Sequence, residues 1–128
     1  MTVNKYEFFL QRTVAGLTTE NISLDKQPFG DTVPQYSALY CELTVCISGS
    51  TNSKMAMEKW ILCWRYSAAN TLSTDSADQL EVRLGTVGIN GPSAVTAEVV
   101  AGNAIIDVTT KQYTGDKMVC RGVVWVGN

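Results

Sequence analysis

The chain has 128 residues, of which 45% are hydrophobic and 17% are charged, and its formal net charge is −2. A chain of this length can bury about two-thirds of its unfolded surface, so we predict a single domain over residues 1–128. The composition excludes a disordered chain, and the scattered lysines and arginines argue against a nucleic-acid partner. The small share of charged residues indicates that part of the surface faces another subunit.

No stretch of the sequence approaches the roughly 20 consecutive apolar residues that span a bilayer. The first residues, Met1 to Tyr6, lack the apolar core of a signal peptide. We therefore expect no membrane partner, and a protein that is made and kept, at least initially, in the cytosol.

Alternation of period two predicts strands from the beginning of the chain. Residues 6–11 place three apolar side chains on one face. After a turn at Ala15-Gly16, residues 17–24 form a more polar strand of the kind that lies at the edge of a sheet. Residues 25–35 hold two of the three prolines and predict a long loop that crosses between sheets.

The clearest strand covers residues 39–48, in which every second side chain is apolar. A polar tip over residues 48–53 leads into a strand over residues 56–66. This strand carries bulky side chains on both faces, which is typical of a central position. Residues 67–78 show no periodicity and predict a second long, exposed loop.

The last third of the sequence predicts a hairpin and a closing strand. A strand over residues 80–84 and a tight turn at Asn90-Gly91 precede two strands that are joined by Gly102-Asn103, a signal for a type I′ or II′ turn. A turn over residues 113–116 precedes a closing apolar strand over residues 118–126. The whole pattern predicts an all-β fold, a β-sandwich or jelly roll of about eight mostly antiparallel strands.

The sequence offers little that could carry catalysis. Histidine is absent from the chain, which removes the usual general base, proton shuttle and metal ligand. No Walker loop, dinucleotide-binding fingerprint or zinc-protease motif is present. We therefore expect no enzyme activity, no metal and no cofactor. A hydrolase built on carboxylates alone needs two of them about 5 to 9 Å apart in a cleft, whereas Asp75, Asp78 and Glu81 fall in a predicted loop and on a predicted solvent face.

The four cysteines, Cys41, Cys46, Cys63 and Cys120, each fall inside a predicted strand. Cys41 and Cys46 are five positions apart in one strand and point to opposite faces, so they cannot share a zinc ion without a bulge. A reducing compartment and apolar neighbours favour free, buried thiols. A Cys63–Cys120 disulfide is the alternative if their strands are neighbours.

The aromatic side chains of Trp60, Trp64 and Tyr66 alternate along one predicted strand and share a face. Such a face suits either a core or an exposed platform on which sugar rings stack, and core packing is the commoner role. A carbohydrate- or receptor-binding module is therefore the alternative function, and it requires these rings to be accessible to solvent.

Seven segments taken together, residues 6–13, 39–45, 60–65, 79–87, 104–109, 113–117 and 119–126, have a characteristic order. This order resembles a β-sandwich module found in bacteriophage head-decoration, tail and fibre proteins. In that family a strand ends near an arginine, a valine-rich strand and a Thr-Gly turn follow, and an Arg/Val/Trp strand closes the module. The cysteines and a shortened loop after residues 88–91 depart from the family's pattern.

The resemblance implies a non-enzymatic structural protein of a phage virion, made in the host cytoplasm. Such a protein decorates or stabilises the capsid surface or forms part of a tail or fibre. The capsid surface is favoured, because the chain shows a single module without a coiled-coil or collagen-like shaft. The expected partners are copies of the chain, as a homotrimer or another closed homo-oligomer, and other virion proteins such as the major capsid protein.

Two segments are candidates for contact with a neighbouring subunit, namely the edge-like strand over residues 17–24 and the loop over residues 28–34. Both are polar enough for water yet able to pair with a neighbour's strand. The candidate interface residues are Leu17, Ile22, Leu24, Pro28, Phe29 and Pro34.

Overall fold

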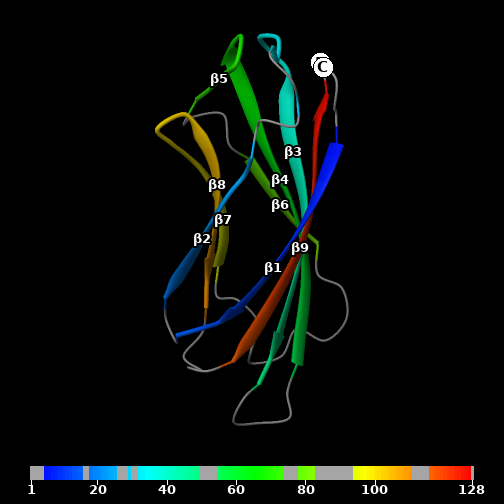
Figure 1. The fold of residues 1–128 in the computed structure, drawn as a ribbon, viewed down its shortest axis with the longest axis vertical. Coiled ribbons are helices and arrows are strands. Elements are labelled where there is room, and N and C mark those ends of the chain that lie inside the picture. Colours follow the sequence, from blue (N-terminus) through cyan, green and yellow to red (C-terminus); the bar gives the residue numbers. More distant parts are fainter. Residues whose placement is uncertain are drawn as a thin grey trace.

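The computed structural model describes residues 5–15, 18–25, 29, 32–49, 55–73, 78–82, 94–110 and 116–127, with the backbone alone for residues 78–82. These residues form nine strands, whose pairings are all antiparallel, in two sheets that face each other (Figure 1). The predicted all-β sandwich is therefore confirmed. The strands are β1 (Lys5–Thr13), β2 (Thr19–Ser23), β3 (Ala38–Ser48), β4 (Met55–Ala68), β5 (Thr71–Leu72), β6 (Asp78–Val82), β7 (Ala94–Val100), β8 (Asn103–Thr109) and β9 (Lys117–Gly127).

The large sheet has the order β1-β9-β3-β4, and both β5 and β6 pair with β4. The small sheet has the order β2-β8-β7. The strand β4 thus has neighbours on both sides, as its bulky faces predict. The closing strand β9 lies between β1 and β3 and pairs with each in unbroken register. The polar strand β2 lies at an edge, as predicted.

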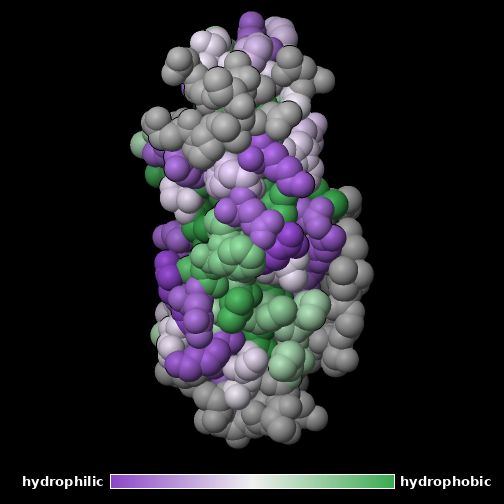
Figure 2. All heavy atoms as spheres, turned by 45° about the vertical axis from the view of Figure 1, so that its right-hand side comes forward, coloured by the Kyte–Doolittle hydropathy of each residue, from purple (hydrophilic) through white to green (hydrophobic). Residues whose placement is uncertain are grey.

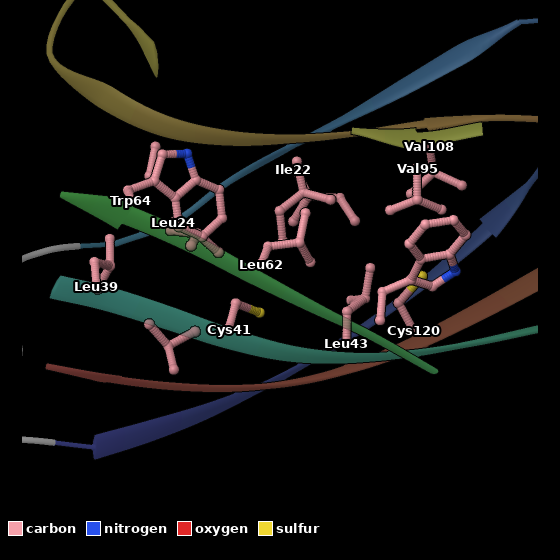
Figure 3. Close-up of a cluster of buried hydrophobic side chains, with 14 of the residues drawn as sticks. Ile22, Leu24, Leu39, Cys41, Leu43, Leu62, Trp64, Val95, Val108 and Cys120 are labelled. Carbon is pink, nitrogen blue, oxygen red and sulfur yellow. The ribbon is translucent and has the colours of Figure 1, made fainter. Parts of the chain in front are cut away.

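The core lies between the two sheets and follows from the alternation of β3, β4 and β9. Every second side chain of these strands is buried, and Figure 3 shows these side chains meeting those of the small sheet. The Trp64 indole N–H donates a hydrogen bond of 2.9 Å to the Glu98 carbonyl oxygen, which joins β4 of the large sheet to β7 of the small sheet. The core therefore holds the two layers through packing and through this polar contact.

The predicted hairpin between β7 and β8 is present, but its turn lies one residue earlier than the sequence indicates. Val100 pairs with Asn103, so the two-residue loop is Ala101-Gly102. Both residues have positive φ, 50° and 79°, as a type I′ turn requires. Asn103 is already the first residue of β8. Alanine is uncommon at such a φ, so the sequence favours Gly102-Asn103 as the loop instead of Ala101-Gly102.

Residues 67–78, expected to be an exposed loop, begin instead with an ordered hairpin. The strand β4 continues to Ala68, and the chain turns at Asn70, whose φ is 59°, into β5. The Asn70 N–H donates to the Val33 carbonyl at 2.8 Å, and the Val33 N–H donates to the Asn70 side-chain oxygen. A distant segment thus stabilises this turn, which local periodicity cannot predict. Residues 74–77, the predicted turn at Asn90-Gly91 and residues 111–115 lie outside the described residues.

The four cysteines are free, and the alternative of a Cys63–Cys120 disulfide is wrong. The strand β3 separates β4 from β9, and the two side chains point to opposite faces of the large sheet. Cys41 and Cys120 are buried as predicted, whereas Cys46 and Cys63 are half-buried on the outer face of the sheet. Cys41 and Cys46 also point to opposite faces, as predicted. Burial raises the pKa of the Cys41 and Cys120 thiols to about 12, so both stay protonated at neutral pH.

Gly122 of β9 makes room for the aromatic ring of Phe8 on the neighbouring strand β1. The two residues are directly opposite in the register, and a Cβ on Gly122 would come within 2.1 Å of the Phe8 ring. Because no heavy atoms approach so closely, any larger residue at position 122 must push the ring aside and uncover the inner face of β1.

We expect Gly122→Ala to lower the free energy of unfolding by about 1–3 kcal/mol, as overpacking does in other cores. Urea denaturation followed by tryptophan fluorescence measures the change. The matched control is Gly127→Ala in the same strand, where the added Cβ would lie 3.7 Å from Tyr40 and should change the stability by less than about 0.5 kcal/mol. The loss should shrink when Phe8→Leu is combined with Gly122→Ala; purely additive effects would contradict this account.

Candidate functional site

The outer face of the large sheet is formed by the outward side chains of β1, β9, β3 and β4. The register places these side chains in rows that run across the four strands, and one row contains Lys5, Trp125, Tyr40 and Cys63. We call the end of the face with this row the Trp125 end, and the opposite end, where β4 begins, the Met57 end. No described strand covers this face, so its side chains are the main candidates for contact with a ligand or partner.

An aromatic pair lies at the Trp125 end. The rings of Tyr40 and Trp125 are stacked, with centroids 5.5 Å apart and planes 18° from parallel. Beside them is an open depression of about 420 Å³, lined by Lys5, Glu42, Val123, Trp125 and Val126. An ammonium group and a carboxylate thus border an apolar floor, which suits a ligand that has both an apolar face and polar edges.

Two ion pairs cross the middle of the outer face. The Arg121 Nε and Nη2 atoms donate to the two carboxylate oxygens of Glu7, each at 3.1 Å, and Lys59 pairs with Glu42. The bidentate hydrogen bond to Arg121 holds the pKa of Glu7 below its ordinary value and raises that of Arg121. Exposed pairs of this kind add little stability, but they neutralise the charges of this zone within the chain.

Apolar side chains gather at the Met57 end. Phe9, Met55, Met57 and Val119 expose 70%, 58%, 40% and 45% of their surface, and the half-buried Cys46 lies between Val119 and Met57 in the register. We call these five residues the Met57 patch. Figure 2 shows hydrophobic surface in the lower half of the molecule, bordered by hydrophilic side chains. Such a contiguous apolar area usually marks a contact surface.

The outer face of the small sheet differs in charge. Glu98 of β7 and Asp107 of β8 lie close enough for a side-chain hydrogen bond, which raises the pKa of Glu98 above its ordinary value of 4.5. Among the described outward side chains of β2, β8 and β7 there is no lysine or arginine. The protonated form of Glu98 is thereby favoured, because it can donate a hydrogen bond to Asp107.

Three of the six residues proposed from the sequence as an interface are in the core. Ile22, Leu24 and Phe29 are buried, and the Phe29 ring packs against Tyr6 with centroids 5.3 Å apart. These three side chains thus contribute to the core of the chain, and their role at an interface stays a prediction. Pro34 is exposed, while Leu17 and Pro28 lie outside the described residues. Pairing of the β2 edge with another subunit stays a prediction.

The three aromatic residues proposed as a stacking platform, Trp60, Trp64 and Tyr66, are buried. Trp60 donates its indole N–H to a carboxylate oxygen of Glu58 at 3.2 Å, and burial raises the pKa of Tyr66. The sugar-binding alternative thus loses the platform on which it was based. The stacked pair Trp125–Tyr40 was missed, although the signal was present: Lys117 and Arg121 share the sequence parity of Trp125 and mark it as outward-facing.

The carboxylates considered for catalysis lie outside the side chains that the structure describes. They are those of Asp75, Asp78 and Glu81. Among the residues that the structure describes, no group of three or more cysteine, aspartate and glutamate residues could hold a metal ion. The same residues include no helix that is long and apolar enough to cross a membrane.

Comparisons with known proteins yield matches among solved structures alone. No protein family matches the sequence. No curated protein matches it either. The chain is similar in structure to part of the tailspike protein gp49 of Acinetobacter baumannii bacteriophage Fri1, a capsular polysaccharide depolymerase, with a TM-score of 0.44 and 12% identity over 95% of this chain and 18% of that one.

Two further tailspike proteins give similar values. For that of Acinetobacter phage vB_ApiP_P1 the TM-score is 0.45 and the identity 10%, over 100% of this chain and 22% of the other. For that of Acinetobacter baumannii phage AM24 they are 0.44 and 9%, over 94% and 26%. The chain thus spans about a quarter or less of the length of each tailspike.

The two carboxylates Glu98 and Glu7 should respond to pH with opposite signs. The raised pKa of Glu98 means that the folded state binds more protons than the unfolded state, so its contribution to stability falls as the pH rises from 4.5 through the folded-state pKa. The lowered pKa of Glu7 gives a contribution that is present above 4.5 and is lost as the pH falls through the folded-state pKa.

We therefore expect the stability of Glu98→Gln, relative to that of the wild type, to rise as the pH increases from 4 to 7. The stability of Glu7→Gln relative to the wild type should fall over the same range. Urea midpoints of the three proteins at the two pH values measure both trends. Each variant serves as the control for the other. If the relative stabilities of both variants changed in the same direction with pH, the opposite pKa shifts of Glu98 and Glu7 would be contradicted.

Proposed function

We propose that the chain is a non-enzymatic structural module of a phage virion, in the tail, a fibre or the capsid surface, that assembles with copies of itself and with other virion proteins. The sequence supports this through the order of its segments, which resembles that of phage virion modules. The structure supports it through one observation above all, the Met57 patch. A sheet face with four large, exposed apolar side chains is built for contact with another protein.

The rest of the architecture is consistent with a structural role. The neighbouring strands β3 and β9 of the large sheet are paired over 11 residues. The described outer faces are regular β-surfaces, and the depression at the Trp125 end is open. A module of this kind acts by presenting the same surface in each subunit of a symmetric assembly, so that modest contacts are multiplied.

Light scattering of the purified protein over a concentration series tests this proposal. We expect a closed homo-oligomer, with a trimer as the leading expectation, at micromolar concentrations. Its mass should stay constant over a range of concentrations, because a closed ring does not grow. A strict monomer at every concentration, or open-ended growth, would contradict a self-assembling virion module.

A second candidate function, binding of a carbohydrate, is favoured by the depression at the Trp125 end. The stacked Tyr40–Trp125 pair offers an aromatic surface beside the Lys5 ammonium and the Glu42 carboxylate. A sugar ring could lie against the aromatic surface, while its hydroxyl groups reach Glu42 and an acidic substituent reaches Lys5. The sequence-based platform is thus replaced by a different aromatic pair on the outer face of the sheet.

If this candidate is right, oligosaccharides that contain uronic acid should change the tryptophan fluorescence, because Trp60 and Trp64 are buried and Trp125 is partly exposed. We expect Trp125→Ala to weaken binding at least about tenfold, and Trp125→Phe to retain most of it. Tyr36→Ala removes an exposed aromatic ring whose recorded contact is with Arg65 rather than with the depression, and should leave binding unchanged. No fluorescence change with any oligosaccharide would dismiss the candidate.

A further inference from the structure

We propose that the Met57 patch is the surface through which copies of this chain associate, around a rotation axis that passes close to Cys46, Met57 and Val119. This inference rests on the proposed structural function and assigns its self-contact to one face of the sandwich. It also moves the interface away from the segments over residues 17–24 and 28–34, whose described apolar side chains, apart from the exposed Pro34, are in the core.

The patch is continuous across the large sheet. Val119 of β9, Cys46 of β3 and Met57 of β4 are direct neighbours in the register, and Met55 lies two residues from Met57 on the same face. Phe9 extends the patch onto the edge strand β1, where it is the most exposed large apolar side chain in the described chain. Of the six large apolar side chains that are exposed among the described residues, four thus lie in a single area, and the other two, Tyr36 and Val100, lie elsewhere.

The charges beside the patch indicate what kind of partner it fits. Arg121 and Lys59, in the row next to Val119 and Met57, are already paired with Glu7 and Glu42 within the chain. A nucleic acid or an anionic membrane would require cations that are available to the partner's phosphates. Lys117, in the row of Met55, donates from its ammonium group to the Thr13 hydroxyl, and among the described outward-facing cations beside the patch it is the one whose recorded contact is not with a carboxylate. One such cation does not make a surface for a polyanion, and the apolar area fits instead a second copy of itself.

The size of the face is compatible with a stable contact. Four strands spaced about 4.8 Å apart, each with nine residues at about 3.4 Å per residue, give a plan area of about 600 Å². The accessible area of protruding side chains exceeds the plan area, so it approaches the roughly 800 Å² per partner that a standard interface buries. The patch supplies the apolar part of such a contact at one end of the face, and the two ion pairs supply a polar part next to it.

Rotational symmetry explains why these residue types suit the position. Side chains close to a rotation axis meet their own counterparts, so an apolar residue there always meets an apolar residue. Methionine is flexible and adapts to an identical neighbour, and a thiol adds little bulk. A charge at the same position would meet a like charge from every other copy, which provides a sharp test.

The test is the native mass of Met57→Lys and of Val119→Lys, measured by light scattering beside the wild type. Each substitution places like charges together at the axis, and we expect self-association to weaken at least about 100-fold. Met57→Leu keeps the apolar surface and should assemble as the wild type does. Val100→Lys adds the same charge at a similarly exposed valine of the small sheet, and should also leave the mass unchanged.

The native cysteine in the patch gives a second measurement that does not depend on a substitution. Alkylation of Cys46, followed by peptide mass spectrometry, should be slower in the assembled protein than at dilutions where it dissociates. In Met57→Lys the rate should be independent of concentration. Circular dichroism of each variant shows whether it is folded, and the wild-type alkylation remains decisive where a variant is not.

The outcomes separate this inference from the proposed function. If the wild type is a closed oligomer whose mass neither lysine variant changes, and Cys46 reacts equally fast at all concentrations, the patch is not the interface, although the structural role stands. If the wild type is monomeric throughout, the proposed function and this inference both fail. The assignment of the interface to the Met57 patch is supported if Met57→Lys and Val119→Lys dissociate while the two control variants do not, and if assembly slows the alkylation of Cys46.

Discussion

The large sheet depends on one non-local constraint, the insertion of β9 between β1 and β3. The C-terminal strand pairs with the first strand over nine register positions and with β3 over 11, so the two ends of the described chain are held together in one layer. This pairing requires that β9 places apolar side chains in the core at every second position. It also requires a glycine, Gly122, where the Phe8 ring lies against β9. The contacts are long-range in sequence, which makes this step slow but cooperative in folding.

The same constraint explains how much of the structure could be predicted. Alternation reveals strands and separates their two faces, and so it gives the sandwich, the central position of β4, the edge position of β2 and the opposite orientations of Cys41 and Cys46. It also gives the β7–β8 hairpin to within one residue. These features depend on residues close in sequence, or on the alternation of side chains between the two faces of a strand, which is the same whichever strand lies beside it.

The features that sequence reasoning missed depend on contacts between distant residues. Parity alone does not say which of two apolar faces is inward, so Trp60 and Trp64 could be mistaken for a platform while Trp125 remained unnoticed in an apolar run. The Asn70 turn is ordered by Val33, 37 positions away. The separation of Cys63 from Cys120 by β3 follows only from the strand order. The candidate site was missed for the same reason, since its rows exist only when four strands are aligned.

The division of the outer face also has a physical basis. An exposed β-face must avoid uncontrolled pairing with other proteins, and charged side chains are the usual protection. Here Arg121, Lys59 and Lys117 lie beside the apolar residues. Ion pairs within the chain limit the repulsion of an identical face by Arg121 and Lys59, and Lys117 is held by the Thr13 hydroxyl. At the edge, Phe9 is exposed on a strand whose inward residues Tyr6, Phe8 and Leu10 are only half-buried. A contact that covers Phe9 would add to the burial of the least covered strand of the large sheet, so that assembly and the ordering of β1 would stabilise each other.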